Sequence, residues 1–473
     1  MRRTIFFIVA FLFVSTTMRA QFGTLRPLHV EGKNLVTDHG QIVTLHGVMD
    51  TPSPYFNNWR WGRDCSTQNI QPCIQYFEKL FTALTDTTQG AYCNLFRLHL
   101  DPCWTNDPNK QSDGNESGEA DISRFSSSRL KTLMQSLYWP IAKRALSHGL
   151  YVIMRPPGVC PQNLKVGDYY QQYLLTVWDI VTQNKKVLEN SDYVSIELAN
   201  EPVNITNADG TTDDKTMREY FQPIVDKIRE NGFRGIIWVP GTGWQSNYKG
   251  YWRYPIKDPA KDTFEWGEQI GYAVHDYPGW YNSSDQNPNM SGVTAQFRTQ
   301  VPVVGRSPIV ITEVDWCPEQ PGTGHYNEHG EWVVSNMGTW ATASTSKWGQ
   351  AFKKILDYFG NISMTLSGTS TYIDIDHYLS TGEVRPAFGG HPEACAAACF
   401  EWYKEYAMQM NADHLALGIE GVEAEDVAIE DNSSVYDLQG RRHDSLQRGL
   451  NIVRTVDDDG TVRVRKVRKV WKN

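Results

Sequence analysis

The sequence predicts an α/β fold, a (β/α)8 TIM barrel with enlarged loops. Short apolar segments rich in β-branched residues alternate with helical periodicities along most of the chain. Most of these segments are apolar throughout, which is typical of parallel strands covered on both faces. Eight strand–helix units in succession favour a closed barrel. A doubly wound sheet is the alternative, but the first strand lacks the glycine-rich turn of its dinucleotide-binding form.

The barrel strands are expected at eight places between residues 21 and 412. They are Ile42–His46, Asn94–His99, Tyr151–Arg155, Val194–Leu198, Gly235–Pro240, Gly271–His275, Ile309–Glu313 and a segment within Ile362–Asp376. Helical periodicity lies between them, with examples at Ser126–His148, Tyr170–Leu188, Thr216–Asn231, Lys347–Phe359 and Pro392–Met410.

The composition is that of a globular, mildly acidic protein. Hydrophobic residues make up 40% of the 473 residues, and 45 Lys and Arg against 54 Asp and Glu give a net charge of −9. Such a chain is neither disordered nor collagen-like, and its acidity argues against nucleic acid as the main partner. The 16 Trp and 23 Tyr are an aromatic surplus, and exposed aromatic rings can stack on flat ligand faces.

The N-terminus has the pattern of an export signal. Arg2 and Arg3 precede the apolar run Ile5–Val14, and small and polar residues lead to Ala20. This run is shorter than a membrane-spanning helix, so residues 1–20 are predicted to be a signal peptide. The mature chain is therefore expected to be secreted or displayed at the cell surface.

The eight cysteines fit an oxidising compartment, where disulfides form. Cys65 and Cys73 lie in one loop-like stretch, and Cys93 and Cys103 flank a strand. A zinc site would need clustered Cys pairs or His partners, which the spacing does not offer. The pairing of the cysteines cannot be read from the sequence.

The organisation changes near residue 412, and residues 413–473 are predicted to be a linker and a small β-rich or disordered appendage. An acidic stretch leads to Val435–Gly440, and the basic end alternates Val and Arg with the period of a strand. This stretch resembles the C-terminal sorting region of proteins exported by the type IX secretion system. Leu450 and Asn451 depart from the usual pattern of that region.

Two glutamates follow predicted strands at positions that favour catalysis. Glu201 follows the fourth strand in Asn200-Glu201-Pro202, and Glu313 ends the seventh. In a (β/α)8 barrel, functional residues gather where the strands end, so these carboxylates are expected to face each other. Retaining glycoside hydrolysis needs such a pair, with one group protonating the leaving oxygen and the other attacking the anomeric carbon.

Other polar and aromatic residues at strand ends are predicted to support this pair. Arg97 would keep a carboxylate ionised, a Tyr277 hydroxyl can donate to it, and Asn200 can bind a sugar hydroxyl. His275 and His99 are expected to contact the substrate or Tyr277. Three tryptophans in loops after strands are expected to stack on sugar faces, namely Trp104, Trp280 and Trp316.

Residues 25–410 resemble glycoside hydrolase family 5 and its clan of (β/α)8 glycosidases. The resemblance rests on Arg97, Asn200-Glu201-Pro202, His275-x-Tyr277 and Glu313. It implies that Glu201 is the acid/base, that Glu313 is the nucleophile, and that the other residues surround them.

Two positions depart from the family. The family carries a His at the end of the third strand, where this chain has Arg155-Pro156-Pro157-Gly158, similar to a turn of exo-β-galactosidases in the clan. The family also has a Trp after the eighth strand, where the nearest aromatic residue here is Tyr372. Both departures leave open which sugar the site binds and whether the enzyme cleaves within a polysaccharide chain or at its end.

The sequence thus predicts a secreted, monomeric, retaining β-glycosidase acting on plant-type polysaccharide, with β-1,4-glucan first and mannan second. Two carboxylates and water suffice for this chemistry, so no metal or organic cofactor is expected. An exo-β-glycosidase, a non-catalytic carbohydrate-binding protein and a metal-dependent hydrolase are the alternatives. The last would need a His pair after the first strand, and His46 has no such partner in sequence.

Overall fold

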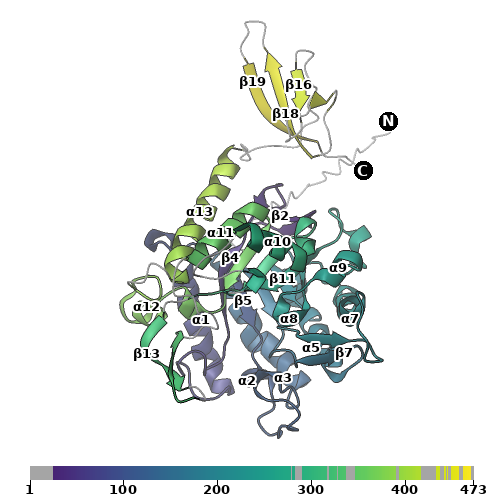
Figure 1. Ribbon diagram of the computed structural model, residues 1–473. Coiled ribbons are helices and arrows are strands. Elements are labelled where there is room, and N and C mark those ends of the chain that lie inside the picture. Colours follow the sequence, from purple (N-terminus) through teal and green to yellow (C-terminus); the bar gives the residue numbers. More distant parts are fainter. Residues whose placement is uncertain are drawn as a thin grey trace, which may run out of the picture.

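The computed structural model describes the barrel region over residues 25–278, 280–282, 290–316, 319–326, 329–336, 347–389 and 394–416, and parts of the C-terminal region after it. Eight parallel strands close into a barrel, which confirms the predicted fold (Figure 1). In barrel order they are β4 (His46–Asp50), β5 (Leu95–His99), β6 (Tyr151–Arg155), β8 (Val194–Glu197), β10 (Ile237–Pro240), β11 (Ile270–His275), β12 (Ile309–Glu313) and β15 (Ile362–Leu366).

Helices surround the barrel and cover the outer faces of the strands (Figure 1). The longer ones are α1 (Ile70–Leu84), α3 (Ser127–Leu133) with α4 (Trp139–Ser147), α5 (Tyr169–Thr182), α7 (Thr216–Glu230), α10 (Met290–Gln300), α11 (Lys347–Phe359) and α13 (Cys395–Ala416). Each buries an apolar stripe against the strands, as α1 does with Ile74, Phe77 and Phe81.

The predicted first strand, Ile42–His46, is wrong. Ile42–Val43 is β3 of a small antiparallel sheet with β1 (Leu28–Glu31) and β2 (Asn34–Thr37), and Ile42 is 54% exposed. The true strand, β4, begins at His46 and contains Gly47 and Asp50, so it does not read as an apolar run. A Cβ atom on Gly47 would lie 1.7 Å from the Leu95 carbonyl oxygen, so close strand contact requires glycine there.

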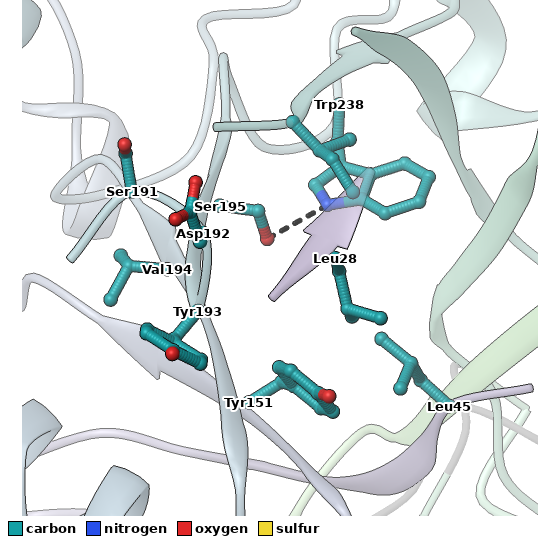
Figure 2. A pocket seen from close by; sticks show the side chains of 10 residues that line it. Leu28, Leu45, Tyr151, Ser191, Asp192, Tyr193, Val194, Ser195 and Trp238 are labelled. Carbon is teal, nitrogen blue, oxygen red and sulfur yellow. Dashed lines mark hydrogen bonds between the residues drawn. The ribbon is translucent and has the colours of Figure 1, made fainter. Parts of the chain in front are cut away.

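The small N-terminal sheet lies against the end of the barrel where the strands begin. The Leu28 amide donates to the Asp192 carbonyl oxygen at 3.0 Å, and the Val30 amide donates to Gln269 Oε1 at 2.7 Å. Figure 2 shows the cavity of about 20 Å³ at this end, where Trp238 Nε1 donates to Ser195 Oγ at 2.9 Å. A space of that size holds about one water molecule, so this end of the barrel is packed.

A disulfide joins Cys65, in the loop after β4, to Cys103 in the short helix α2 (Pro102–Thr105) after β5. The crosslink closes a 38-residue separation and ties two neighbouring loops together at the mouth of the barrel. Among the other cysteines that the structure describes, Cys73, Cys93, Cys160 and Cys399 are buried free thiols, and Cys395 is also buried.

The helix α13 continues through residue 412, the predicted end of the barrel domain, as far as Ala416. A separate antiparallel sheet follows, with strand order β17 (Arg442–His443), β16 (Ser433–Tyr436), β18 (Gly449–Val456) and β19 (Val462–Lys469). Residues 417–432, which hold most of the predicted acidic linker, lie outside the described residues, as do residues 1–20. In the part of the chain that the structure describes, no helix is long and apolar enough to cross a membrane.

We expect the barrel to fold without residues 417–473. The buried side chains of α13, including Cys395, Cys399 and Tyr403, precede this cut, and Tyr403 donates to the Gly47 carbonyl oxygen at 2.8 Å. A chain ending at Ala416 should keep the thermal unfolding midpoint of the barrel. A chain ending at Ala394 should unfold at a lower temperature, because it loses those contacts. Loss of folding in the chain that ends at Ala416 would show that the C-terminal sheet is part of the barrel's core.

Candidate active site

A cavity of about 380 Å³ opens where the barrel strands end. It is lined by residues at or just beyond the ends of several strands, among them Asp50, His99, Arg155, Glu201, Tyr277 and Glu313. These residues are far apart in the sequence, and the closed barrel brings them together. The cavity is therefore at the end where (β/α)8 barrels carry their functional groups.

The two predicted carboxylates meet in this cavity. Single ligand-type atoms of Glu201, His275 and Glu313 all lie within 4.8 Å of one another. His275 Nδ1 is 3.1 Å from Glu201 Oε1 and 3.6 Å from Glu313 Oε2. Because both neighbours are acceptors, we assign the proton to Nδ1, which donates to Glu201. His275 thus sits between the carboxylates.

Arg97 on β5 is a fully buried cation that serves two glutamates. Its Nε and one terminal nitrogen donate to Glu197 at 2.6 and 3.0 Å, and the other terminal nitrogen donates to Glu313 Oε1 at 2.8 Å. Burial alone would lower the pKa of Arg97, but the charges of Glu197 and Glu313 and their hydrogen bonds raise it above its usual value. Arg97 therefore remains charged and fixes the position of Glu313.

Glu313 is held as an anion. Burial favours its neutral form, but the charges of His275, Arg97 and Arg155 and the hydrogen bond from Arg97 outweigh this and lower its pKa to about 2. The Tyr277 hydroxyl donates to Glu313 Oε2 at 3.1 Å, so both carboxylate oxygens accept hydrogen bonds. At neutral pH the Glu313 carboxylate is ionised and oriented.

The predicted binding residues Asn200 and His99 also line the cavity. Asn200 Oδ1 accepts from Arg97 at 2.7 Å, so its side-chain nitrogen can donate to a ligand. His99 contacts Arg155 at 3.1 Å and accepts from the Gly158 amide at 3.2 Å. Burial and the charges of Arg155 and Arg97 hold the pKa of His99 well below its usual value. His99 therefore stays neutral and supports the turn after the third strand.

The predicted stacking of Trp104 and Trp316 on sugar rings disagrees with the structure, because both side chains are fully buried. Trp104 donates to the Pro52 carbonyl oxygen at 2.7 Å, and Trp316 packs against Trp348 and Trp402. Trp280 is half-buried against Tyr277. Loop position alone does not show whether an indole points outward. Tyr372 is also buried, stacked on the aromatic rings of α13.

Exposed aromatic residues lie instead in the loop after β4. Tyr55, Phe56 and Trp59 are 66%, 59% and 41% exposed, and they meet edge to face with ring centroids 5.1 and 5.7 Å apart. Phe56 lines the cavity. Asn57 Nδ2 donates to the Thr51 carbonyl oxygen at 2.8 Å, which helps to hold the loop. This aromatic cluster was not predicted, although three aromatic residues within five positions are a visible signal in the sequence.

Two further residues of the site, Glu197 and Gln245, were missed. Glu197 is a fully buried carboxylate on β8 that accepts from Arg97, Thr312 and Gln245. A glutamate inside an apolar strand is a recognisable signal of a buried ion pair. Gln245 lies in a short turn after β10, and nothing in the sequence marks it.

Two groups of three acidic and histidine residues, among those the structure describes, are close enough to hold a metal ion. One is the Glu201, His275 and Glu313 group, and the other is His99, Asp101 and Glu119. Arg97 pairs with the first group, and Arg155 lies 3.1 Å from His99 and 3.9 Å from Glu119 in the second. These guanidinium charges disfavour a bound cation at either place.

A closed (β/α)8 barrel with paired glutamates after its fourth and seventh strands has the arrangement of a glycoside hydrolase. The sequence profile described as Cellulase (glycosyl hydrolase family 5) matches residues 82–355, more than half of the chain. The chain therefore belongs to glycosyl hydrolase family 5 and is an O-glycosyl hydrolase. This membership confirms the resemblance and argues against a non-catalytic or metal-dependent protein.

Solved structures of other proteins are similar to this chain. A β-glucanase from Saccharophagus degradans in complex with cellotetraose is 16% identical, with a TM-score of 0.50, and the match covers 82% of this chain and 95% of that one. A β-mannanase from Streptomyces thermolilacinus is 13% identical, with a TM-score of 0.39 and coverage of 72% and 84%. No curated protein sequence matches the chain.

Proposed function

We propose that this glycoside hydrolase cleaves β-glycosidic bonds with retention of anomeric configuration. The observation that carries the proposal is the proximity of Glu201 and Glu313, whose nearest oxygens lie within 4.8 Å. Retaining enzymes hold their carboxyl groups about 5–5.5 Å apart, whereas inverting enzymes need a wider gap for a water molecule. The short distance fits direct attack by one carboxylate.

In this proposal Glu313 is the nucleophile and Glu201 is the acid/base. Arg97, His275 and Arg155 keep Glu313 ionised, so it can attack the anomeric carbon. Glu201, with 27% of its side chain exposed, gives its proton to the departing glycosidic oxygen. Water then attacks the glycosyl ester on Glu313, and Glu201 takes up a proton from that water. The Tyr277 hydroxyl donates to the nucleophile Glu313, and Asn200 binds a sugar hydroxyl.

Removal of each carboxylate should give a different kinetic result. Glu313→Ala should abolish turnover of all β-glycosides, because no covalent intermediate forms. Glu201→Ala should lower kcat/KM, which reports the step that expels the leaving group, by about 10²–10⁴-fold on unactivated substrates, but much less on a dinitrophenyl glycoside, whose leaving group needs no proton. The kcat on both substrates should fall, because Glu201 is also the base for hydrolysis of the glycosyl ester. Steady-state rates on both substrates measure this, and circular dichroism checks folding. If Glu201→Ala lowered kcat/KM equally on both substrates, Glu201 would not be the acid.

We propose a plant-type polysaccharide as substrate, with β-1,4-glucan first and β-mannan second. The family profile is described as cellulase. Phe56 lines the cavity, and the exposed rings of Tyr55 and Trp59 adjoin it, so flat apolar rings are available to the faces of successive sugars. Arg155, at the place where family members carry a His, gives the cavity a second cation next to the catalytic pair.

Product analysis tests both substrate and stereochemistry. Incubation with soluble β-1,4-glucan should release oligosaccharides of several lengths, and NMR should show the β-anomer before mutarotation. A matched incubation with mannan and with aryl glycosides distinguishes a mannanase and an exo-acting enzyme by their products. Initial release of the α-anomer from a β-linked substrate would contradict retention.

We propose that the protein is exported, with residues 1–20 removed, as the charged and apolar N-terminal pattern indicates. The cysteine pairing between Cys65 and Cys103 suits an oxidising compartment. Mass spectrometry of the protein from the medium or cell surface of an expressing host should find an N-terminus at or near Gln21. A mature protein that retains Met1 would contradict the proposal.

A further inference from the structure

We propose that Gln245 is a positioning residue that fixes the main chain of Glu201 and thereby aims its carboxyl group at the glycosidic oxygen. The inference rests on the proposed acid/base role of Glu201. It concerns how that role is maintained, because Gln245 is fully buried and does not line the cavity.

Glu201 adopts a backbone conformation that needs support. Its φ is +56°, in the left-handed region that is unfavourable for a residue with a side chain. Such residues persist where neighbouring contacts determine their conformation. Without those contacts the backbone would relax, and the carboxyl group would turn away from its position beside His275.

The side chain of Gln245 supplies the contact at Glu201 itself. Gln245 Oε1 accepts from the Glu201 amide at 2.7 Å, and Gln245 Nε2 donates to Glu197 Oε1 and to the Ala273 carbonyl oxygen, both at 3.1 Å. One acceptor and two donors are required here, and a primary amide provides that set. The same side chain thus joins Glu201 to β8 and to β11, the strand that carries His275.

The main chain around Gln245 reinforces this link. Gly243, Trp244 and Gln245 are all left-handed, with φ of 60°, 55° and 60°. The Trp244 amide donates to the Pro202 carbonyl oxygen at 3.0 Å, and the Gly243 amide donates to the Val203 carbonyl oxygen at 2.9 Å. Two unusual backbone segments therefore hold each other, with the Gln245 side chain completing the contact.

The link also reaches the proposed nucleophile. Glu197 accepts from both Gln245 and Arg97, and Arg97 donates to Glu313. A continuous buried series of hydrogen bonds thus runs from the Glu201 amide to the Glu313 carboxylate. Arg97 already fixes Glu313 by direct contact, whereas Glu201 depends on Gln245, so loss of the Gln245 amide should affect the acid more than the nucleophile.

The test is Gln245→Met, which keeps the length of the side chain and removes its hydrogen bonds. A misaligned acid should lower kcat/KM on unactivated oligosaccharides by about 10²-fold. The kcat/KM for a dinitrophenyl glycoside should change by no more than about threefold, since departure of its leaving group needs no proton. Equal losses on the two substrates, or no loss on either, would overturn the proposal.

Gln269→Met is the matched control. Gln269 is also a buried glutamine, with hydrogen bonds to the Val30 amide, the Val30 carbonyl oxygen and the Gly267 carbonyl oxygen, but it lies at the opposite end of the barrel. Its variant should lower the unfolding temperature without separating the two substrates. A leaving-group effect of equal size in this control would show that general destabilisation explains the result.

Gln245→Glu provides a second test that keeps the shape of the side chain. Its ionised form should repel Glu197, and its protonated form can donate to Glu197 again. The optimum of kcat on oligosaccharides should therefore move to lower pH, and an unmoved optimum would count against the proposal. If Glu201→Ala itself shows no leaving-group effect, the acid assignment fails; if only the Gln245 variants lack the effect, the positioning role fails.

Discussion

The pairing of Arg97 with Glu197 and Glu313 is the interaction on which the site depends. Three ionised side chains are buried there, and burying an unpaired charge is costly. Arg97 satisfies its partners through several hydrogen bonds, so the group is stable only when complete. The arrangement needs β5, β8 and β12 to meet around one axis, which a closed barrel provides.

This buried ion group also separates the chemical environments of Glu201 and Glu313, the two proposed catalytic glutamates. Glu313 contacts Arg97, whereas Glu201 contacts His275 and is more exposed. Glu197 accepts hydrogen bonds from Arg97 and Gln245 and does not line the cavity. It therefore connects the residues that hold Glu313 with those that hold Glu201. The positions of the three carboxylates relative to the Arg97 guanidinium therefore determine their roles. Glu197 is structural, Glu313 is the anion in the cavity, and Glu201 is the carboxyl group most open to substrate.

The sequence predicted the barrel and the meeting of Glu201 and Glu313 at its mouth because both depend on local patterns. Most of the buried parallel strands are mainly apolar, Glu313 is the last residue of β12, and Glu201 lies four residues after the end of β8. The first strand was misplaced because close packing there requires Gly47, which interrupts the apolar pattern. Trp316 and Gln245 could not be interpreted locally, since burial of an indole and the partners of an amide depend on segments distant in sequence.

The aromatic surface of the site has a different origin from the one that the family pattern suggests. After the eighth strand, Ser367 and Thr369 line the cavity where family members carry a Trp, and Thr369 donates to Asp50 at 2.6 Å. That wall is small and polar, so it can offer hydrogen bonds but no flat apolar face. The exposed aromatic rings come from the loop after β4, which Asn57 and the Cys65–Cys103 disulfide hold in place. The proposed function therefore assigns stacking on sugar rings to the loop after β4 and hydrogen bonding to the wall after β15.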